Sequence, residues 1–210
     1  MKTRIFNLII LDESGSMQLI KEEAINGVNE TVQTILHAQQ KHKEQEHFVS
    51  LVTFNIDTRT IWECIPATEI KEISRTDYYP NCSTALYDAM GMSLNALLPH
   101  VAPNDKILVT IVTDGEENAS KEYNKKSIKA LVEELKSKGW VFVYIGANQD
   151  VKKVTENISI HNVMNFNATS EGTLEAWRIS MKSSSQLYSR ISDGSFCAET
   201  ENECFFNEKK

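Results

Sequence analysis

Apolar residues in this chain fall into two kinds of pattern that alternate along its length. Short continuous runs rich in β-branched and aromatic residues are typical of buried strands; they lie at 4–11, 48–54, 60–65, 106–113, 140–145 and 162–166. Elsewhere apolar residues recur every three or four positions, the spacing of an amphipathic helix; these segments lie at 17–35, 86–97, 120–138, 150–156 and 171–190. The pattern therefore predicts strands that alternate with helices.

This alternation predicts an α/β fold: a doubly wound, Rossmann-like sheet of about six mostly parallel strands, with helices on both faces. The link 55–57 between the second and third runs is short enough for a hairpin, so we expect one antiparallel edge strand. We also expect the common strand order 3-2-1-4-5-6, in which the first and fourth strands are neighbours at the point where the winding direction reverses.

Length and composition fit one globular domain. The 210 residues are 41% hydrophobic and 24% charged, and this length favours a single domain with an extension. We place the domain at 1–192 and interpret 193–210 as a polar, loosely held C-terminal tail. The apolar runs are far shorter than the roughly 20 residues that a membrane-spanning helix needs, and residues 1–11 are interpreted as a strand rather than a signal peptide. A cytoplasmic monomer without membrane association is expected.

Charge and cysteine usage exclude several classes of function. The net charge is −7, and no cluster of Lys and Arg alternates with aromatic residues, so nucleic acid is not expected as a ligand. The four cysteines include no Cys-x-x-Cys pair, which favours reduced thiols in the cytosol over a disulfide framework. His37, His42 and His47 are five residues apart and are interpreted as surface residues rather than zinc ligands.

The candidate chemistry lies in turns between strands and helices. The sequence Asp12-Glu13-Ser14-Gly15-Ser16 follows the first strand directly, Asp114 follows the fourth strand, and Thr84 lies just before a helix. A helix-capping loop is the alternative interpretation of the first segment. In the expected strand order, however, Asp12 and Asp114 face one crevice, where a divalent cation would relieve their repulsion with help from hydroxyl oxygens.

Oxygen donors without His or Cys favour Mg²⁺, with Mn²⁺ or Ca²⁺ as alternatives, and disfavour zinc. The predicted ligand set is listed here in chain order: Asp12, Ser14, Ser16, Thr84 and Asp114. The flanking residues Glu13, Glu116 and Glu117 are interpreted as a solvated loop face and are left out of this set.

These residues resemble the von Willebrand factor type A (vWA) domains, whose metal-ion-dependent adhesion site consists of Asp-x-Ser-x-Ser, a separate Thr and a later Asp. All five positions are filled in the same order, and the resemblance covers most of the chain. It implies that the hydroxyl groups bind the metal directly, that the aspartates act partly through water, and that a Glu or Asp of a protein partner completes the coordination. The chain looks similar to small standalone intracellular bacterial vWA proteins.

One departure from the family pattern concerns the threonine loop. It reads Asn81-Cys82-Ser83 where many relatives have glycines, and the bulkier loop could hold Thr84 away from the metal. The resemblance also implies that the engagement of Thr84 can differ between resting and bound states, and that the last helix shifts with it in some relatives.

Two other functions compete with metal-bridged protein binding. A Mg²⁺-dependent phosphatase or phosphoryl-transfer enzyme also carries Asp at strand ends, but such a site of the haloacid-dehalogenase type needs a second Asp where this chain has Ser14. No Walker A, GxGxxG or Ser-His-Asp motif is present in the sequence, so we expect a protein that is not an enzyme. The third possibility is a structural scaffold in which the metal only stabilises the fold.

Overall fold

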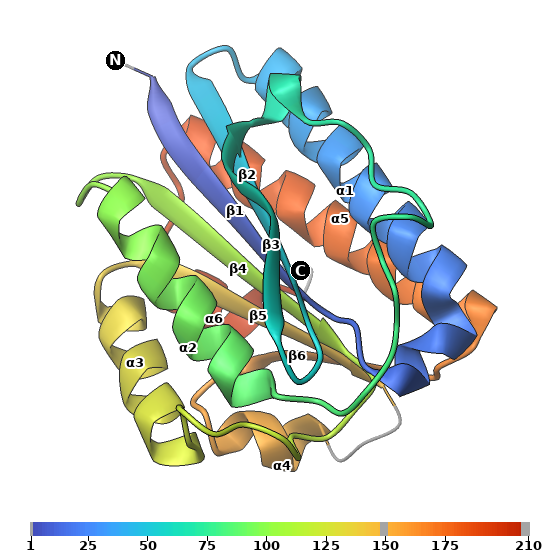
Figure 1. Cartoon of the computed structure of the whole chain (residues 1–210). Coiled ribbons are helices and arrows are strands. Elements are labelled where there is room, and N and C mark those ends of the chain that lie inside the picture. The colour runs from blue at the N-terminus through green and yellow to red at the C-terminus, as the bar shows by residue number, and fades with distance from the viewer. Residues whose placement is uncertain (1, 148–150, 207–210) are drawn as a thin grey trace.

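The computed structural model describes residues 2–147 and 151–206, which form a six-stranded sheet covered by helices (Figure 1). The strand order is β3-β2-β1-β4-β5-β6, as expected, and only the β2–β3 pair is antiparallel among the described pairs. The strands are β1 (Thr3–Asp12), β2 (Gln45–Phe54), β3 (Thr58–Pro66), β4 (Lys106–Thr113), β5 (Trp140–Ala147) and β6 (Asn162–Phe166). The predicted fold class is confirmed.

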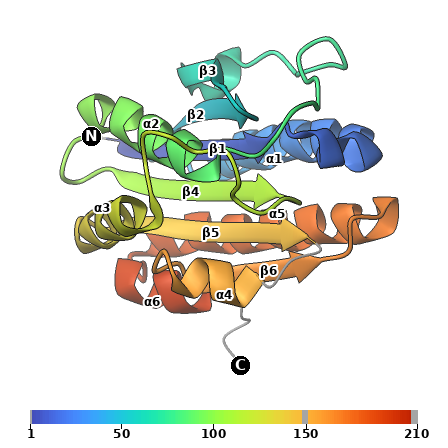
Figure 2. The same ribbon diagram turned by 60° about the horizontal axis from the view of Figure 1, so that its bottom comes forward.

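Helices cover both faces of the sheet, as Figure 2 shows when the strands are viewed from the side. One face is covered by α1 (Lys21–Lys41) and α5 (Ser170–Asp193), and the other by α2 (Leu86–Leu97), α3 (Lys125–Ser137) and α4 (Val151–Glu156). Short 3-10 turns lie at Gly15–Ile20, Ala67–Glu69 and Leu98–His100. The predicted helix 150–156 begins at a residue that lies outside the described ranges.

The two faces of the sheet build two separate apolar cores because successive side chains of a strand point to opposite sides. In β1, Ile5 and Ile9 belong to the core under α1 and α5, whereas Phe6 and Leu8 belong to the core under α2 and α3. Every residue from Ile5 to Asp12 is buried. A central strand that is buried on both faces reads as one continuous apolar run, which explains its clear signal in the sequence.

The strand register brings the ends of β1 and β4 together at the carboxyl edge of the sheet. Leu11 pairs with Val112, so Asp12 and Thr113 occupy neighbouring positions one residue further on. After β1 the chain enters the helix layer of α1, and the chain reaches β4 from α2 on the opposite face. The winding direction therefore reverses between these two strands, where open α/β sheets bind ligands.

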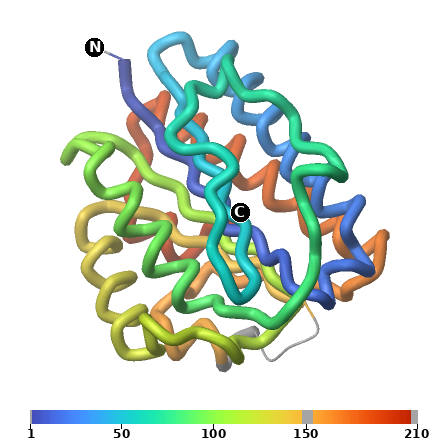
Figure 3. The backbone as a smooth tube through the Cα atoms, viewed as in Figure 1, coloured from blue at the N-terminus to red at the C-terminus, as the bar shows by residue number. Residues whose placement is uncertain are grey.

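A long connection between β3 and α2 also leads to this edge. Figure 3 shows the segment 70–85, in teal and green, running beside the N-terminal half of α1. Asn29 holds it there, because its side chain donates to the carbonyl of Ile73 (2.9 Å) and accepts from the amide of the same residue (3.0 Å). The 70–85 segment thus carries Thr84 from the side of the sheet to its carboxyl edge.

The C-terminal residues differ from the expectation. Residues 198–204 form a further helix, α6 (Ala198–Cys204), and Phe205 is 1% exposed. Asn202 accepts from the amide of Phe142 (3.1 Å) and donates to the carbonyl of Trp140 (2.8 Å), so α6 is fixed to the start of β5. Residues 198–205 are therefore packed against the sheet and do not form the loosely held tail that we expected. Within the described residues, no helix combines the length and apolar character needed to cross a membrane.

The interpretation of His47 as a surface residue is wrong. The strand β2 begins at Gln45, earlier than predicted, and His47 is one of its buried residues. Its ring is fully buried and lies 3.0 Å from Oε1 of Gln45, with the Tyr188 ring packed edge-on against it. Burial lowers the pKa of His47 to about 4. Tyr188 in turn donates to Oδ1 of Asn7 (2.7 Å), so a buried polar network joins α5 to β1 and β2.

Candidate metal centre

The fold brings all five predicted ligands to the carboxyl edge of the sheet. Asp12 is the last residue of β1, Ser14 and Ser16 lie in the following turn, Thr84 precedes α2, and Asp114 follows β4. Ser16 is exposed, whereas the other four are at most 9% exposed. The group therefore has a buried floor and one side open to solvent.

The carboxylate of Asp12 is held at both oxygens. Its Oδ1 accepts from the amide of Ser14 (2.7 Å), and its Oδ2 accepts from the hydroxyl of Thr113 (2.5 Å). Thr113 also contacts the backbone of Gly115, since its hydroxyl lies 3.1 Å from both the amide nitrogen and the carbonyl oxygen of that residue. These bonds fix the orientation of the Asp12 carboxylate, and each of its oxygens keeps a second lone pair.

The two serines connect this carboxylate to Asp114. Oγ of Ser16 donates to Oδ1 of Asp114 (2.6 Å), and Oγ of Ser14 lies 3.3 Å from Oγ of Ser16. Residues 98 positions apart in the sequence are thus in direct contact. A row of hydroxyl and carboxylate oxygens runs from the turn after β1 to the turn after β4.

The hydroxyl of Thr84 also lies near Asp12, because both side chains border Gly115. A Cβ atom at Gly115 would lie 2.8 Å from Oγ1 of Thr84 and 3.5 Å from Oδ2 of Asp12. The Thr84 backbone is fixed on both sides, since its amide donates to Oδ1 of Asn118 (2.9 Å) and its carbonyl accepts from the amide of Asn118 (3.0 Å). Gly115 therefore leaves the space in which the Thr84 hydroxyl and Asp12 approach each other.

Without a bound cation, burying the two carboxylates of this group costs free energy. Burial raises the pKa of Asp12 to about 6, and the nearby charge of Asp114 acts in the same direction. Burial also raises the pKa of Asp114. None of the ion pairs found among residues 2–147 and 151–206 involves either carboxylate. Two buried carboxylates without a basic partner fit a site for a divalent cation.

The donor set fits the same conclusion. All five side chains offer oxygen atoms, which hard cations prefer, and the serine and threonine hydroxyls are neutral donors. The five side chains together therefore offer a divalent cation two charged and three neutral oxygen donors. A bound cation would stabilise the charged form of both aspartates.

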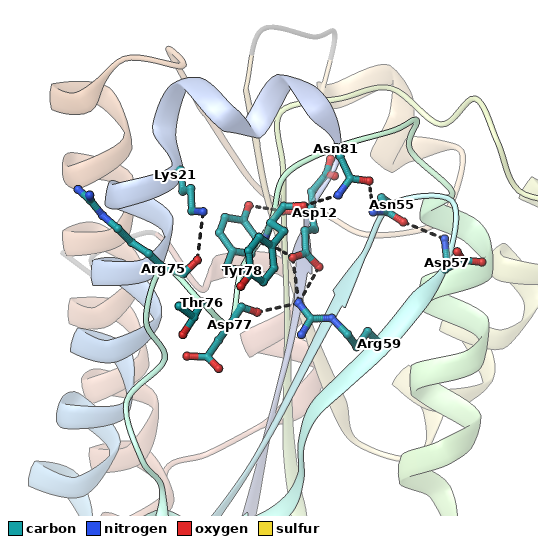
Figure 4. Close-up of polar contacts among 12 residues, drawn as sticks. Asp12, Lys21, Asn55, Asp57, Arg59, Arg75, Thr76, Asp77, Tyr78 and Asn81 are labelled. Carbon is teal, nitrogen blue, oxygen red and sulfur yellow. Dashed lines mark hydrogen bonds and ion pairs between the residues drawn. The ribbon is translucent and has the colours of Figure 1, made fainter.

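Sequence reasoning missed residues that support this group. Thr113 could have been suspected, because it is a polar residue at the end of an apolar run and precedes Asp114. Tyr78 gave no signal: its hydroxyl donates to the backbone carbonyl of Asp12, and the residue is fully buried (Figure 4). The motif alone could not place a tyrosine that is 66 positions away.

Two of the flanking glutamates do not form a solvated loop face, which corrects that interpretation. Glu13 is 4% exposed and is paired with Arg59. Glu117 accepts from the amides of Tyr87 (2.9 Å) and Ser120 (2.8 Å) and thereby caps the start of α2. Only Glu116 is exposed as expected.

Comparison with known proteins agrees with this geometry. A family model of the von Willebrand factor type A domain matches residues 8–178. A similar structure, the von Willebrand factor type A protein from Catenulispora acidiphila, has a TM-score of 0.63 at 14% identity and aligns over 87% of this chain and 43% of its own. Proximal thread matrix protein 1 from the mussel byssus, solved with a zinc-occupied MIDAS motif, has a TM-score of 0.59 at 17% identity. The alignment covers 88% of this chain and 46% of the mussel chain.

BatB from Bacteroides thetaiotaomicron has a TM-score of 0.52 at 14% identity, with 87% of this chain and 98% of BatB covered. The chain spans less than half the length of the Catenulispora and mussel chains. The comparison with curated protein sequences finds no significant match. The match over residues 8–178 includes all five predicted ligands, and this chain belongs to the von Willebrand factor type A domain family.

Proposed function

We propose that this chain is a metal-dependent protein-binding module whose cation is completed by a Glu or Asp of a partner. The observation that carries the proposal is the convergence of three hydroxyl-bearing side chains and two buried carboxylates at one partly open edge of the sheet. Neutral donors leave much of the cation's charge uncompensated, so the ion retains affinity for one more anionic oxygen.

Mg²⁺ is the proposed ion, with Mn²⁺ and Ca²⁺ as alternatives. The support is chemical: the five side chains supply only oxygen atoms, and small hard cations are held by such donors together with water. The zinc in the mussel protein belongs to that protein, and zinc is therefore one of the ions to be compared.

Exposed apolar side chains near the site support a protein as the partner. Leu19 is 80% exposed in the turn that follows Ser16, and Ile56 is 50% exposed at the tip of the β2–β3 hairpin. Tyr79 is 52% exposed beside the buried Tyr78, with the amine of Lys21 lying 5.1 Å from its ring centre. Apolar and aromatic groups around a charged centre are typical of protein interfaces.

The contacts of Asp12 favour binding over catalysis. A phosphoryl-transfer site of the haloacid-dehalogenase type needs a second Asp two positions after the nucleophile, to serve as general acid, whereas that position is Ser14, whose amide donates to Oδ1 of Asp12. We therefore propose that the chain is not an enzyme. Metal-dependent hydrolysis of phosphoesters that is lost on Asp12→Asn would contradict this part of the proposal.

The test is affinity capture from the lysate of the source cells, combined with calorimetric titration of Mg²⁺, Mn²⁺, Ca²⁺ and Zn²⁺. Wild type in Mg²⁺, wild type in EDTA and Thr84→Val in Mg²⁺ are compared, with the exposed Thr68→Val as the matched control. We expect a protein that is retained by wild type and Thr68→Val in Mg²⁺ and lost in the other two arms. Equal retention in all arms would overturn the proposal.

A scaffold role gives a different result. If the metal only stabilises the fold, Thr84→Val lowers the melting temperature in Mg²⁺ while every captured protein stays bound. The capture and the melting curves are therefore measured on the same preparations, so that loss of a partner is separated from loss of the fold.

A further inference from the structure

Glu13, the residue between Asp12 and Ser14 in the Asp-x-Ser-x-Ser motif, has an unusual position for a glutamate. It is 4% exposed and lies in the turn directly after β1. Glutamate side chains are seldom buried unless they are paired, because removing a carboxylate from water is costly. Its contacts show what balances this cost.

The carboxylate of Glu13 lies between the side chain of Arg59 and the backbone of the 70–85 segment. Nη2 of Arg59 donates to both of its oxygens (2.9 and 3.1 Å), and the amide of Tyr79 donates to Oε1. The same Arg59 nitrogen also donates to the carbonyl of Asp77 (2.7 Å). Glu13 and Arg59 therefore hold the 70–85 segment at two successive points.

The backbone continues this contact toward Thr84. The amide of Asn81 donates to the carbonyl of Glu13 (2.9 Å), and the amide of Gly15 donates to the carbonyl of Cys82 (3.0 Å). Residues 77–82 thus lie along residues 12–15, and Thr84 follows two positions later. The segment contains Cys82 at a φ of 60°, a conformation that costs free energy for a residue other than glycine.

We propose that Glu13 is a positioning residue that, together with Arg59, sets the place of the Thr84 hydroxyl at the metal. The inference rests on the proposed metal site. Glu13 does not touch the cation; its carboxylate fixes the 70–85 segment, whose last residues carry Thr84, against the turn that carries Ser14 and Ser16. The Asp-Glu-Ser-Gly-Ser sequence therefore encodes both the ligands and the anchor of the distant threonine.

A purely electrostatic role of Glu13 predicts a different response. If Glu13 only attracted the cation by its charge, then removing the positive charge of Arg59 would tighten metal binding. If Glu13 and Arg59 position Thr84, removing either partner weakens metal binding. The two explanations differ in the sign of the effect of Arg59→Met.

The experiment measures Mn²⁺ affinity by calorimetry for wild type, Glu13→Gln, Arg59→Met, Thr84→Val and the double variant Glu13→Gln/Thr84→Val. We expect Glu13→Gln and Arg59→Met each to weaken binding by about tenfold, the size of effect that outer positioning contacts usually have. The double variant is expected to bind no more weakly than Thr84→Val alone, because Glu13 acts through Thr84.

Several outcomes would overturn the inference: wild-type affinity in both single variants, tighter binding by Arg59→Met, or additive losses in the double variant. Circular dichroism of the metal-free proteins checks the fold. If Glu13→Gln does not fold, Arg59→Met alone tests the inference, because the Arg59 side chain is 46% exposed and its replacement leaves the core intact. If wild type itself binds no Mn²⁺, the proposed function fails as well. If wild type binds Mn²⁺ and both single variants bind it equally well, the proposed metal site stands and only the role of Glu13 is refuted.

Discussion

The hydroxyl of Thr113 donates a 2.5 Å hydrogen bond to Oδ2 of Asp12, joining the carboxyl ends of β4 and β1. Both residues are fully buried. Because Ser14 already holds Oδ1, this bond fixes the second oxygen of the same carboxylate. The strand register that places β4 beside β1 thereby also sets the orientation of the central aspartate of the candidate metal site.

Replacing Thr113 by valine is expected to weaken Mn²⁺ binding by about ten- to a hundredfold, because groups that orient a metal ligand have effects of this size. Valine has nearly the same shape, so the apolar packing at the end of β4 is kept. Calorimetric titration measures the effect. Thr113→Ser keeps the hydroxyl and serves as the matched control, and equal affinities of the valine variant and wild type would contradict the assigned role of Thr113.

Gly115→Ala is expected to reduce metal affinity without unfolding the protein. The added Cβ would lie 2.8 Å from Oγ1 of Thr84, so the Thr84 hydroxyl must move away from Asp12. Gly15→Ala is the matched control in the same site, because its Cβ would meet its nearest neighbour, the carbonyl oxygen of Cys82, at 3.5 Å, an ordinary contact distance. Similar metal affinities for the two alanine variants would show that Thr84 does not need this space.

Asp12→Asn is expected to abolish metal-induced stabilisation but to make the metal-free protein more stable at pH 7. Burial raises the pKa of Asp12 from 3.8 to about 6 in the folded state. Protonation therefore stabilises the folded protein, and this contribution is fully present below pH 3.8 and is lost as the pH rises through about 6. The penalty at pH 7 is roughly 2–3 kcal/mol, and the neutral amide avoids it.

Urea unfolding in EDTA measures this effect at pH 7 and pH 4. The advantage of Asp12→Asn over wild type should shrink to well under 1 kcal/mol at pH 4, where the folded wild type is itself largely protonated at Asp12. An advantage of the same size at both values would mean that the charge of Asp12 is not its cause. A lower stability of the variant at pH 7 would show that the carboxylate has a compensating partner.

The predicted strand order and the grouping of the five candidate ligands depended on local signals. Buried parallel strands give continuous apolar runs, and turns at strand ends give polar residues at fixed places, so Asp12 and Asp114 could be assigned to one edge. The start of α3 was predicted at residue 120, whereas the helix begins at Lys125 after the capping residue Asn124. Helix spacing alone does not distinguish a capped start from a polar loop before it.

Long-range polar contacts could not be predicted in this way. Glu13 looks like an exposed loop residue until Arg59, 46 positions away, is found beside it. His47 lies in a polar stretch but becomes buried because Tyr188, near the other end of the chain, packs on its ring. Such pairs depend on which distant segments meet, and a single sequence carries no periodic signal for them.

The segment after α5 gives the last prediction, because Glu201 stabilises it through a buried ion pair. Nε and Nη2 of Arg190 donate to the two oxygens of Glu201, both at 2.6 Å, and the Glu201 side chain is 3% exposed. Glu201→Gln removes the charge that pairs directly with Arg190 in a partly buried place, and we expect a loss of about 2–3 kcal/mol of unfolding free energy. Glu203→Gln is the matched control: Glu203 is 56% exposed and pairs with His161 at the surface, so its replacement should change stability by less than about 0.5 kcal/mol. Urea unfolding of the three proteins at pH 7 measures the effect, and equal stability of Glu201→Gln and wild type would mean that the Arg190–Glu201 ion pair contributes little to the stability of the fold.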